Sequence, residues 1–265
     1  IPLRSPVPSV ATLNDLAFAE HPEWFRSRLQ VEQFRRQARG AVREARAIVT
    51  VSEHIRQRIV RHYHCDPSRV HVVPNGVDAS SSDAVPDHPV DPVLRTLGIQ
   101  GSYVLALDGA ARRNAEVAVE AWQSLRARGR TEALVVVGGH GSSEVGVVRV
   151  PAFSDWRWPA LLQRAAAFCY PTADESFGMP ALESIAAGTP VVCAPVGALP
   201  EVLGDAALWV ESPSAANLAD RLEELLGDDE KQRAAAEVGR RRAALWPTWE
   251  AIAEQLLAVY ELAFQ

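Results

Sequence analysis

Residues 166–193 read AAFCYPTADESFGMPALESIAAGTPVVC, and this stretch indicates the fold class most clearly. An apolar run ends at Tyr170, a polar loop and a proline-started segment follow, and a second apolar run begins at Pro190. Gly188 before that run marks the end of a helix. Strand, loop, helix and strand in this order predict a βαβ unit of a parallel sheet. The loop falls at the carboxyl end of a strand, where open α/β sheets bind ligands.

The same alternation continues on both sides of this stretch and predicts an α/β protein with parallel sheets. Strands are expected at residues 9–13, 47–51, 70–73, 103–107, 133–137, 147–150, 167–170, 190–194 and 207–210. Helices are expected at residues 22–44, 53–62, 114–128, 155–166, 180–187, 215–226, 230–245 and 249–264.

Composition and charge indicate which kind of partner and which cellular compartment to expect. The 265 residues carry a net charge of −6, and no long cluster of Lys and Arg stands beside aromatic residues, which argues against a nucleic-acid partner. Cys65, Cys169 and Cys193 are widely spaced, so no disulfide framework is indicated. We expect a cytoplasmic protein, either free or peripheral to a membrane.

Two carboxylates bracket the loop inside the opening stretch. Glu175 precedes a Phe-Gly turn, and Glu183 lies about one turn into the helix that Pro180 starts. Gly178 lets the backbone approach a ligand closely, and the free amides of a helix start suit a phosphate. An ionised carboxylate such as Glu183 has two acceptor oxygens, which match the two hydroxyls of a ribose.

These residues resemble the family-4 glycosyltransferases, retaining enzymes of the GT-B fold that use nucleotide-sugar donors. In that family two glutamates, separated by seven residues, surround a glycine-containing loop, as Glu175 and Glu183 do here. The resemblance implies that Glu175 lies near the donor sugar and that Glu183 binds the ribose. It implies that the loop between them contacts the sugar and the diphosphate; the loop residues are Ser176, Phe177, Gly178, Met179 and Pro180.

A second loop, residues 108–114, resembles the family's glycine loop that ends in a basic pair. Gly109, Arg112 and Arg113 are the candidate donor-binding residues here, and Arg113 is also a candidate catalytic residue. A guanidinium can bind a phosphate through two parallel hydrogen bonds. The loop departs from the family pattern, because Asp108 stands where a glycine is usual and would repel a diphosphate unless it turns away. A solvated loop is the alternative interpretation.

A third candidate catalytic residue is Asn14. The segment Thr12-Leu13-Asn14-Asp15-Leu16 resembles a family segment in which a histidine faces the donor sugar. Asparagine can still donate and accept hydrogen bonds, but it cannot carry a proton. A simple turn at Asn14-Asp15 is the alternative.

The resemblance implies two Rossmann-like domains that face a cleft. We expect a partial acceptor-side domain at residues 1–78, a linker at 79–100, a nucleotide-sugar-binding domain at 101–246, and a helix at 247–265 that crosses back to the first domain. The first region holds too few strands for a complete domain, so we expect that a missing segment or a second chain completes it, or that the protein has lost this part. The connection over residues 139–147 is short for a parallel crossover.

The sequence therefore predicts a glycosyltransferase that moves a sugar from a nucleotide-diphosphate donor to an unidentified hydroxyl acceptor with retention of configuration. A non-catalytic relative that binds nucleotide or a partner subunit is the alternative. No metal or other cofactor is expected: His62 and His64 suggest a helix end rather than a metal site. Trp156, Trp158, Trp246 and Trp249 are expected to be packing anchors.

Overall fold

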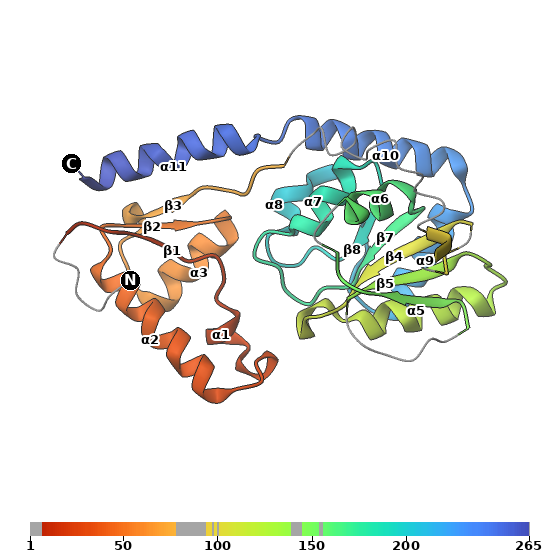
Figure 1. The fold of residues 1–265 in the computed structure, drawn as a ribbon, viewed down its shortest axis with the longest axis horizontal. Coiled ribbons are helices and arrows are strands. Elements are labelled where there is room, and N and C mark those ends of the chain that lie inside the picture. The colour runs from red at the N-terminus through yellow and green to blue at the C-terminus, as the bar shows by residue number, and fades with distance from the viewer. Residues whose placement is uncertain are drawn as a thin grey trace. The chain divides into compact units, whose positions relative to one another are not determined.

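The computed structural model describes residues 7–77, 94–96, 98–99, 101–138, 145–153 and 156–264. The chain divides into two compact units (Figure 1). Unit 1 comprises Ile1–Gly76 and Pro247–Gln265, and unit 2 comprises Val77–Trp246. Most of the expected linker, and residues 139–144 of the short connection, lie outside the described residues.

Within the described residues, unit 2 contains a six-stranded parallel sheet in the order β6-β5-β4-β7-β8-β9. Its strands are β4 (Tyr103–Leu107), β5 (Ala133–Val137), β6 (Val147–Val150), β7 (Ala167–Tyr170), β8 (Val191–Cys193) and β9 (Ala207–Trp209). The strand order runs outward from β4 in both directions. The topological switch point of this sheet therefore lies between β4 and β7, where open α/β sheets bind ligands.

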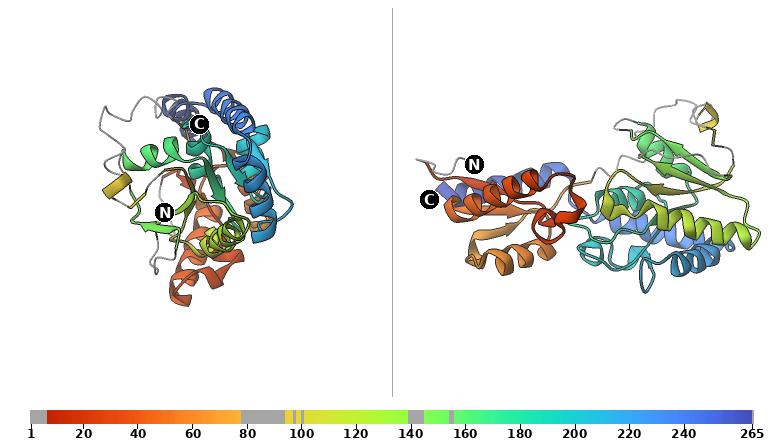
Figure 2. Two further views of the ribbon diagram at one scale, coloured as in Figure 1. Left: turned by 90° about the vertical axis from the view of Figure 1, so that its right-hand side faces the viewer. Right: turned by 90° about the horizontal axis from the view of Figure 1, so that it is seen from below.

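Helices cover both faces of this sheet (Figures 1 and 2). They are α5 (Ala115–Ala127), α6 (Arg157–Arg164), α7 (Met179–Ala186), α8 (Leu199–Leu203), α9 (Ala215–Leu226) and α10 (Asp229–Ala244). Alternate residues of β4 point to opposite faces: Val104 joins the cluster beneath α5 and α9, whereas the hydroxyl of Tyr103 donates to the Leu161 carbonyl of α6 at 2.6 Å.

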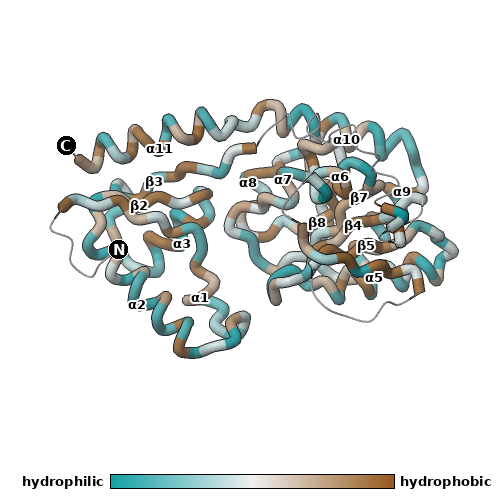
Figure 3. Tube along the Cα trace, in the orientation of Figure 1, coloured by the Kyte–Doolittle hydropathy of each residue, from teal (hydrophilic) through white to brown (hydrophobic). Residues whose placement is uncertain are grey.

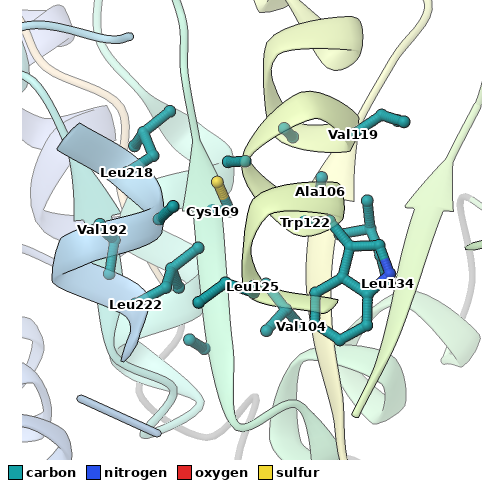
Figure 4. Close-up of a cluster of buried hydrophobic side chains, with 14 of the residues drawn as sticks. Val104, Ala106, Val119, Trp122, Leu125, Leu134, Cys169, Val192, Leu218 and Leu222 are labelled. Carbon is teal, nitrogen blue, oxygen red and sulfur yellow. The ribbon is translucent and has the colours of Figure 1, made fainter. Parts of the chain in front are cut away.

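The main core of unit 2 lies beneath α5 and α9 (Figure 4). Trp122 is 1% exposed there, and Leu125, Leu222 and Val192 surround the same space. Burial of each large apolar side chain stabilises the unit by about 1.5–3 kcal/mol. Figure 3 shows the consequence: hydrophobic residues collect along the strands, whereas α10 is largely hydrophilic.

Unit 1 is built on a parallel sheet in the order β1-β2-β3. Its elements are β1 (Val10–Thr12), β2 (Ala47–Thr50), β3 (Val70–Val72), α1 (Ala17–Glu20), α2 (Arg28–Glu44), α3 (Glu53–Tyr63) and α11 (Trp249–Phe264). Ile48 of β2 packs with α2 and α3 on one face. Val49 packs with Ile252 and Val259 of α11 on the other, so the last helix of the chain covers the first sheet.

The predicted strands are confirmed, but the helix expected over residues 22–44 needs correction. The helix expected over 22–44 is two elements: a 3-10 turn (Pro22–Trp24) and α2, because Phe25 is extended and the Ser27 hydroxyl accepts from the Gln30 amide at 3.4 Å to start a new helix. β5 and β6 are parallel neighbours although only residues 138–146 join them.

His62 and His64 end a helix, as expected, since His64 is the left-handed C-cap of α3. Among the described residues, no group of three or more His, Cys, Asp or Glu side chains could hold a metal ion. Where the helices are described, none is long and apolar enough to cross a membrane.

Candidate functional site

Two loops leave the sheet of unit 2 on either side of the switch point. The β4 loop comprises residues 108–114, and the β7 loop comprises residues 171–178. Both begin at the carboxyl ends of adjacent parallel strands, so they emerge at the same edge of the sheet. Every sequence-predicted site residue except Asn14 lies in these loops or in the helix α7 that follows.

Hydrogen bonds join the two loops. The Arg112 carbonyl accepts from the Ala173 amide at 2.8 Å and from the Thr172 hydroxyl at 3.2 Å. The side-chain amide of Asn114 donates to the Pro171 carbonyl at 3.0 Å. The β4 loop is therefore held against the β7 loop by backbone and side-chain contacts, and Arg112 lies near Glu175.

Glu175 is 6% exposed, and its carboxylate is surrounded by donors. The hydroxyl of Tyr170 donates to Oε2, and the Ser176 amide donates to Oε1 at 3.2 Å. The guanidinium of Arg112 lies 3.8 Å from Oε1. Burial of a carboxylate is costly unless such partners are present. These contacts fix the orientation of Glu175 before any ligand binds.

The Tyr170 hydroxyl keeps donating its hydrogen bond to Glu175 at ordinary pH. Burial raises the pKa of the Tyr170 hydroxyl, the adjacent Glu175 carboxylate raises it further, and Arg113 and Arg112 oppose the shift only in part. The hydroxyl therefore keeps its proton and cannot itself act as a base.

The β7 loop ends at Gly178, which starts α7. Gly178 has φ +99°, and a Cβ there would meet Leu199 Cδ2 at 2.5 Å, so the position requires glycine. α7 begins with Met179 and Pro180; Pro180 has no N–H, and the Ala181 and Leu182 amides donate to the Gly178 carbonyl at 3.0 Å. Phe177 is buried against Trp246, with ring centroids 5.7 Å apart, so its side chain anchors the loop.

The basic pair of the β4 loop has unused hydrogen-bonding capacity. The Nε atoms of Arg112 and Arg113 are both buried without a partner in the described structure. Arg113 Nη1 donates to the Asp108 carbonyl at 2.5 Å, which fixes the side chain across the loop. The Arg112 side chain is 30% exposed, so the loop presents a cation at a place where an anion can bind.

Asp108 turns its charge away from this place. Its Oδ1 accepts from the Gly109 amide at 2.6 Å, and its Oδ2 lies 3.6 Å from Arg149 Nη1. The departure from the family pattern is therefore compensated by a neighbouring arginine of β6. The Gly109 amide serves the loop itself, and the role of Gly109 in donor binding stays a prediction.

Glu183 lies on α7, partly buried, and one of its oxygens is engaged. The indole N–H of Trp158 donates to Glu183 Oε2 at 2.8 Å. Burial raises the pKa of Glu183, and the hydrogen bond from Trp158 opposes that rise. Trp158 is thus more than the packing anchor that the sequence suggested.

A separate pocket of about 310 Å³ lies between α9, α10 and β9. Asp205 and Ala206, which precede β9, line it together with Leu208, so it is near the amino end of that strand. Its charged residues Glu224 and Lys231 already pair with each other at 2.7 Å. This pocket is at the opposite edge of the sheet from the two loops and contains none of the motif residues.

Family comparisons agree with the geometry of the loops. Residues 109–242, which include both loops and α7, match the family model described as glycosyl transferases group 1. The chain belongs to the family-4 glycosyltransferases. Residues 1–81 match a second model, described as Glycosyltransferase Family 4.

Curated relatives of this family-4 glycosyltransferase include an MMP α-(1→4)-mannosyltransferase of Mycolicibacterium hassiacum, 30% identical over 233 residues. That match covers 83% of this chain and 55% of the relative. A D-inositol 3-phosphate glycosyltransferase of Corynebacterium aurimucosum is 34% identical over 225 residues, covering 76% of this chain and 53% of the relative. The chain therefore spans about half the length of these relatives.

Solved structures show the same fold. HepE of Anabaena, solved in complex with UDP-glucose, matches with a TM-score of 0.78 at 17% identity over 96% of this chain and 72% of that one. WaaG, a glycosyltransferase involved in lipopolysaccharide biosynthesis, matches with a TM-score of 0.73 at 20% identity over 97% and 76%. The fold of this family-4 glycosyltransferase is of the GT-B type, and each of its two units contains a parallel sheet.

Asn14 is separate from the other candidates because it belongs to unit 1. It is exposed and follows β1, at the carboxyl end of that strand. The neighbouring Asp15 carboxylate accepts from the Ala17 amide, the first amide of α1. Residues 13–16 are extended or irregular rather than a regular turn, and a catalytic role of Asn14 stays a prediction.

Sequence reasoning missed three residues of this family-4 glycosyltransferase. Tyr170 and Trp158 donate to the two motif glutamates, and Gly197 lies against the backbone of Glu175. The Ala198 amide next to that glycine donates to the Glu175 carbonyl at 2.8 Å. A signal was present only for Tyr170, because it ends the strand directly before the motif loop.

Gly197→Ala is expected to destabilise unit 2 strongly. A Cβ at Gly197 would lie 2.1 Å from the Glu175 carbonyl oxygen, and φ is +57°. The clash and the left-handed backbone together should cost about 2–4 kcal/mol. Urea unfolding measures the loss. Gly129→Ala is the matched control, because φ is +94° there but a Cβ would meet nothing within 4 Å. Equal losses in the two variants would contradict the close approach.

Proposed function

We propose that this chain provides the donor site of a retaining glycosyltransferase, which transfers a sugar from a nucleoside-diphosphate donor to a hydroxyl acceptor. The main support for the proposal is the arrangement of the β4 and β7 loops at the switch point. They bring a buried glutamate, two arginines and the glycine-started helix α7 to one edge of the sheet. That combination suits a sugar linked to a diphosphate.

Each part of the site has a role in this proposal. Arg112 and Arg113 bind the diphosphate together with the backbone amides of residues 177–179, which lead into α7. Glu183 accepts hydrogen bonds from the ribose hydroxyls. Glu175 accepts from a hydroxyl of the donor sugar. The structure of HepE with UDP-glucose supports a nucleotide sugar as the donor class.

Catalysis in this proposal rests on stabilisation of the leaving diphosphate. As the bond between the anomeric carbon and the phosphate oxygen breaks, charge grows on that oxygen, and the two guanidinium groups and the amides of residues 177–179 stabilise it. No metal is needed to supply that charge.

The hydrogen bonds of Glu175 argue against a covalent intermediate between this carboxylate and the sugar. Tyr170 holds one oxygen, while the Ser176 amide and Arg112 contact the other. A carboxylate engaged in this way is poorly placed to attack a sugar. Transfer on the donor face that the leaving group occupies, with the phosphate assisting the acceptor hydroxyl, fits better and retains configuration.

A non-catalytic nucleotide-binding subunit is the second candidate, and Asn14 favours it. The side chain of Asn14, near the carboxyl end of β1, cannot carry a proton. The two candidates differ in one measurable property: the enzyme releases nucleoside diphosphate from a sugar donor, and the binder does not.

Calorimetric titration with UDP, GDP and ADP, followed by hydrolysis assays with UDP-glucose and GDP-mannose, tests the proposal. We expect binding of one of the diphosphates and slow release of diphosphate from the matching sugar donor. Binding without release would support the subunit. No binding of any diphosphate would contradict both candidates.

Nucleotide affinity should also depend on pH through Glu183. The ionised form accepts the ribose hydroxyls, so affinity is present above the pKa of Glu183 in the folded protein and is lost below it. Because burial raises that pKa, the loss should begin at a higher pH than for an exposed glutamate. Titration of wild type and Glu183→Gln over acidic to neutral pH checks this, since phosphate ionisation affects both proteins alike. A pH-independent affinity ratio would contradict the role of Glu183.

A further inference from the structure

A row of aromatic side chains joins the two motif glutamates. Trp158 of α6 meets Phe168 of β7 edge to face, with ring centroids 6.4 Å apart. Phe168 stacks on Tyr170 of the same strand at 5.1 Å. Trp158 donates to Glu183 at one end of the row, and Tyr170 donates to Glu175 at the other.

The middle of this row is rigid. Phe168 and Tyr170 are two residues apart on β7 and so point to the same face of the sheet. They are 0% and 1% exposed. Interiors are close-packed, so neither ring can turn without displacing its neighbours. Trp158 is half-buried, and its indole is held by the edge-to-face contact with Phe168 at one side and by the hydrogen bond to Glu183 at the other.

We propose that Trp158 is a positioning residue that orients Glu183 toward the ribose and thereby sets the preference for ribonucleotides over deoxyribonucleotides. This role rests on the proposed function of the site. The indole N–H occupies one acceptor position on Oε2, which fixes the plane of the carboxylate on α7. The remaining acceptor positions are then presented together, as two vicinal hydroxyls require.

A single substitution can separate the hydrogen bond of Trp158 from its packing. Phenylalanine preserves an aromatic ring against Phe168 but has no N–H group. Trp158→Phe therefore removes the hydrogen bond to Glu183 while an apolar ring stays in place. A freed carboxylate samples several rotamers, and ordering it on binding then costs affinity.

The test is the affinity ratio of a ribonucleotide to its 2′-deoxy form, measured by calorimetry with UDP against 2′-deoxy-UDP and with GDP against 2′-deoxy-GDP. The wild type should prefer the ribonucleotide by about tenfold or more, as expected for a hydrogen bond to a charged group. Trp158→Phe should reduce that preference to less than about threefold, mainly by weaker ribonucleotide binding.

Trp209→Phe is the matched control. The indole of Trp209 donates to the Gly204 carbonyl at 3.0 Å, at the edge strand β9, so the variant loses the same kind of hydrogen bond away from the two loops. Its ribose preference should equal that of the wild type. Tyr170→Phe removes the donor at the other end of the row; it should slow sugar release but leave the ribose preference unchanged.

A second readout separates orientation from general damage to the fold. The Trp158 N–H stabilises ionised Glu183, so Trp158→Phe should move the loss of nucleotide affinity to higher pH. An unchanged ribose preference and an unchanged pH profile in Trp158→Phe would overturn the role of Trp158 alone. Failure of the wild type to bind any of the four nucleotides would overturn the proposed function and this role with it.

Discussion

Glu175→Gln is expected to reduce the release of sugar from the donor by about 100- to 1000-fold, the effect typical of losing one fixed electrostatic contact in a transition state. The amide has nearly the shape of the carboxylate, so the loop should keep its conformation. It lacks the charge that accepts from a sugar hydroxyl, and its NH₂ group would face the Tyr170 hydroxyl or the Ser176 amide. Turnover of the sugar donor that the chain uses is the measurement.

The affinity for the nucleoside diphosphate should change little in Glu175→Gln, because Glu175 is assigned to the sugar rather than to the nucleotide. Asp174→Asn makes the same charge change one residue earlier and should keep near-normal turnover. If Glu175→Gln turned over like Asp174→Asn, the assignment of Glu175 would be wrong.

Replacement of Arg112 and Arg113 together by methionine should produce the second large effect. Each guanidinium is expected to contribute a charge-assisted contact to the diphosphate, worth about 1.5–3 kcal/mol. The double variant should therefore bind the diphosphate at least about 100-fold more weakly. Calorimetry with the preferred nucleoside diphosphate measures the change.

Salt dependence gives this prediction a second check. Wild-type affinity should fall as ionic strength rises, and the double variant should show a weaker dependence because fewer charges face the ligand. Arg126→Met is the control: it removes a positive charge from the far end of α5, where the side chain is exposed. An equal loss of affinity in the control would show that net charge, and not the β4 loop, governs binding.

Much of unit 2 could be predicted from the sequence because its signals are local. The apolar run to Tyr170, the proline that starts α7 and Gly188 each act within a few residues, and together they give β7, α7 and β8. The two motif glutamates and the basic pair could also be predicted, because each pair has a fixed spacing along a short stretch of the chain.

The supporting contacts could not be predicted in the same way. The hydrogen bond from Trp158 to Glu183 joins two helices, and the approach of Gly197 to Glu175 joins two loops. Neither periodicity nor spacing encodes such pairs, since tertiary packing decides which side chains meet. The neutralisation of Asp108 by Arg149 depends in turn on β6, which follows β5 after a short connection.

The most direct test of the account is a crystal structure of the chain with the nucleoside diphosphate that it binds. We expect the diphosphate beside Arg112 and Arg113 at the start of α7, with the ribose hydroxyls on Glu183. A nucleotide bound elsewhere, such as the pocket between α9 and α10, would contradict the assignment of the switch-point loops as the donor site.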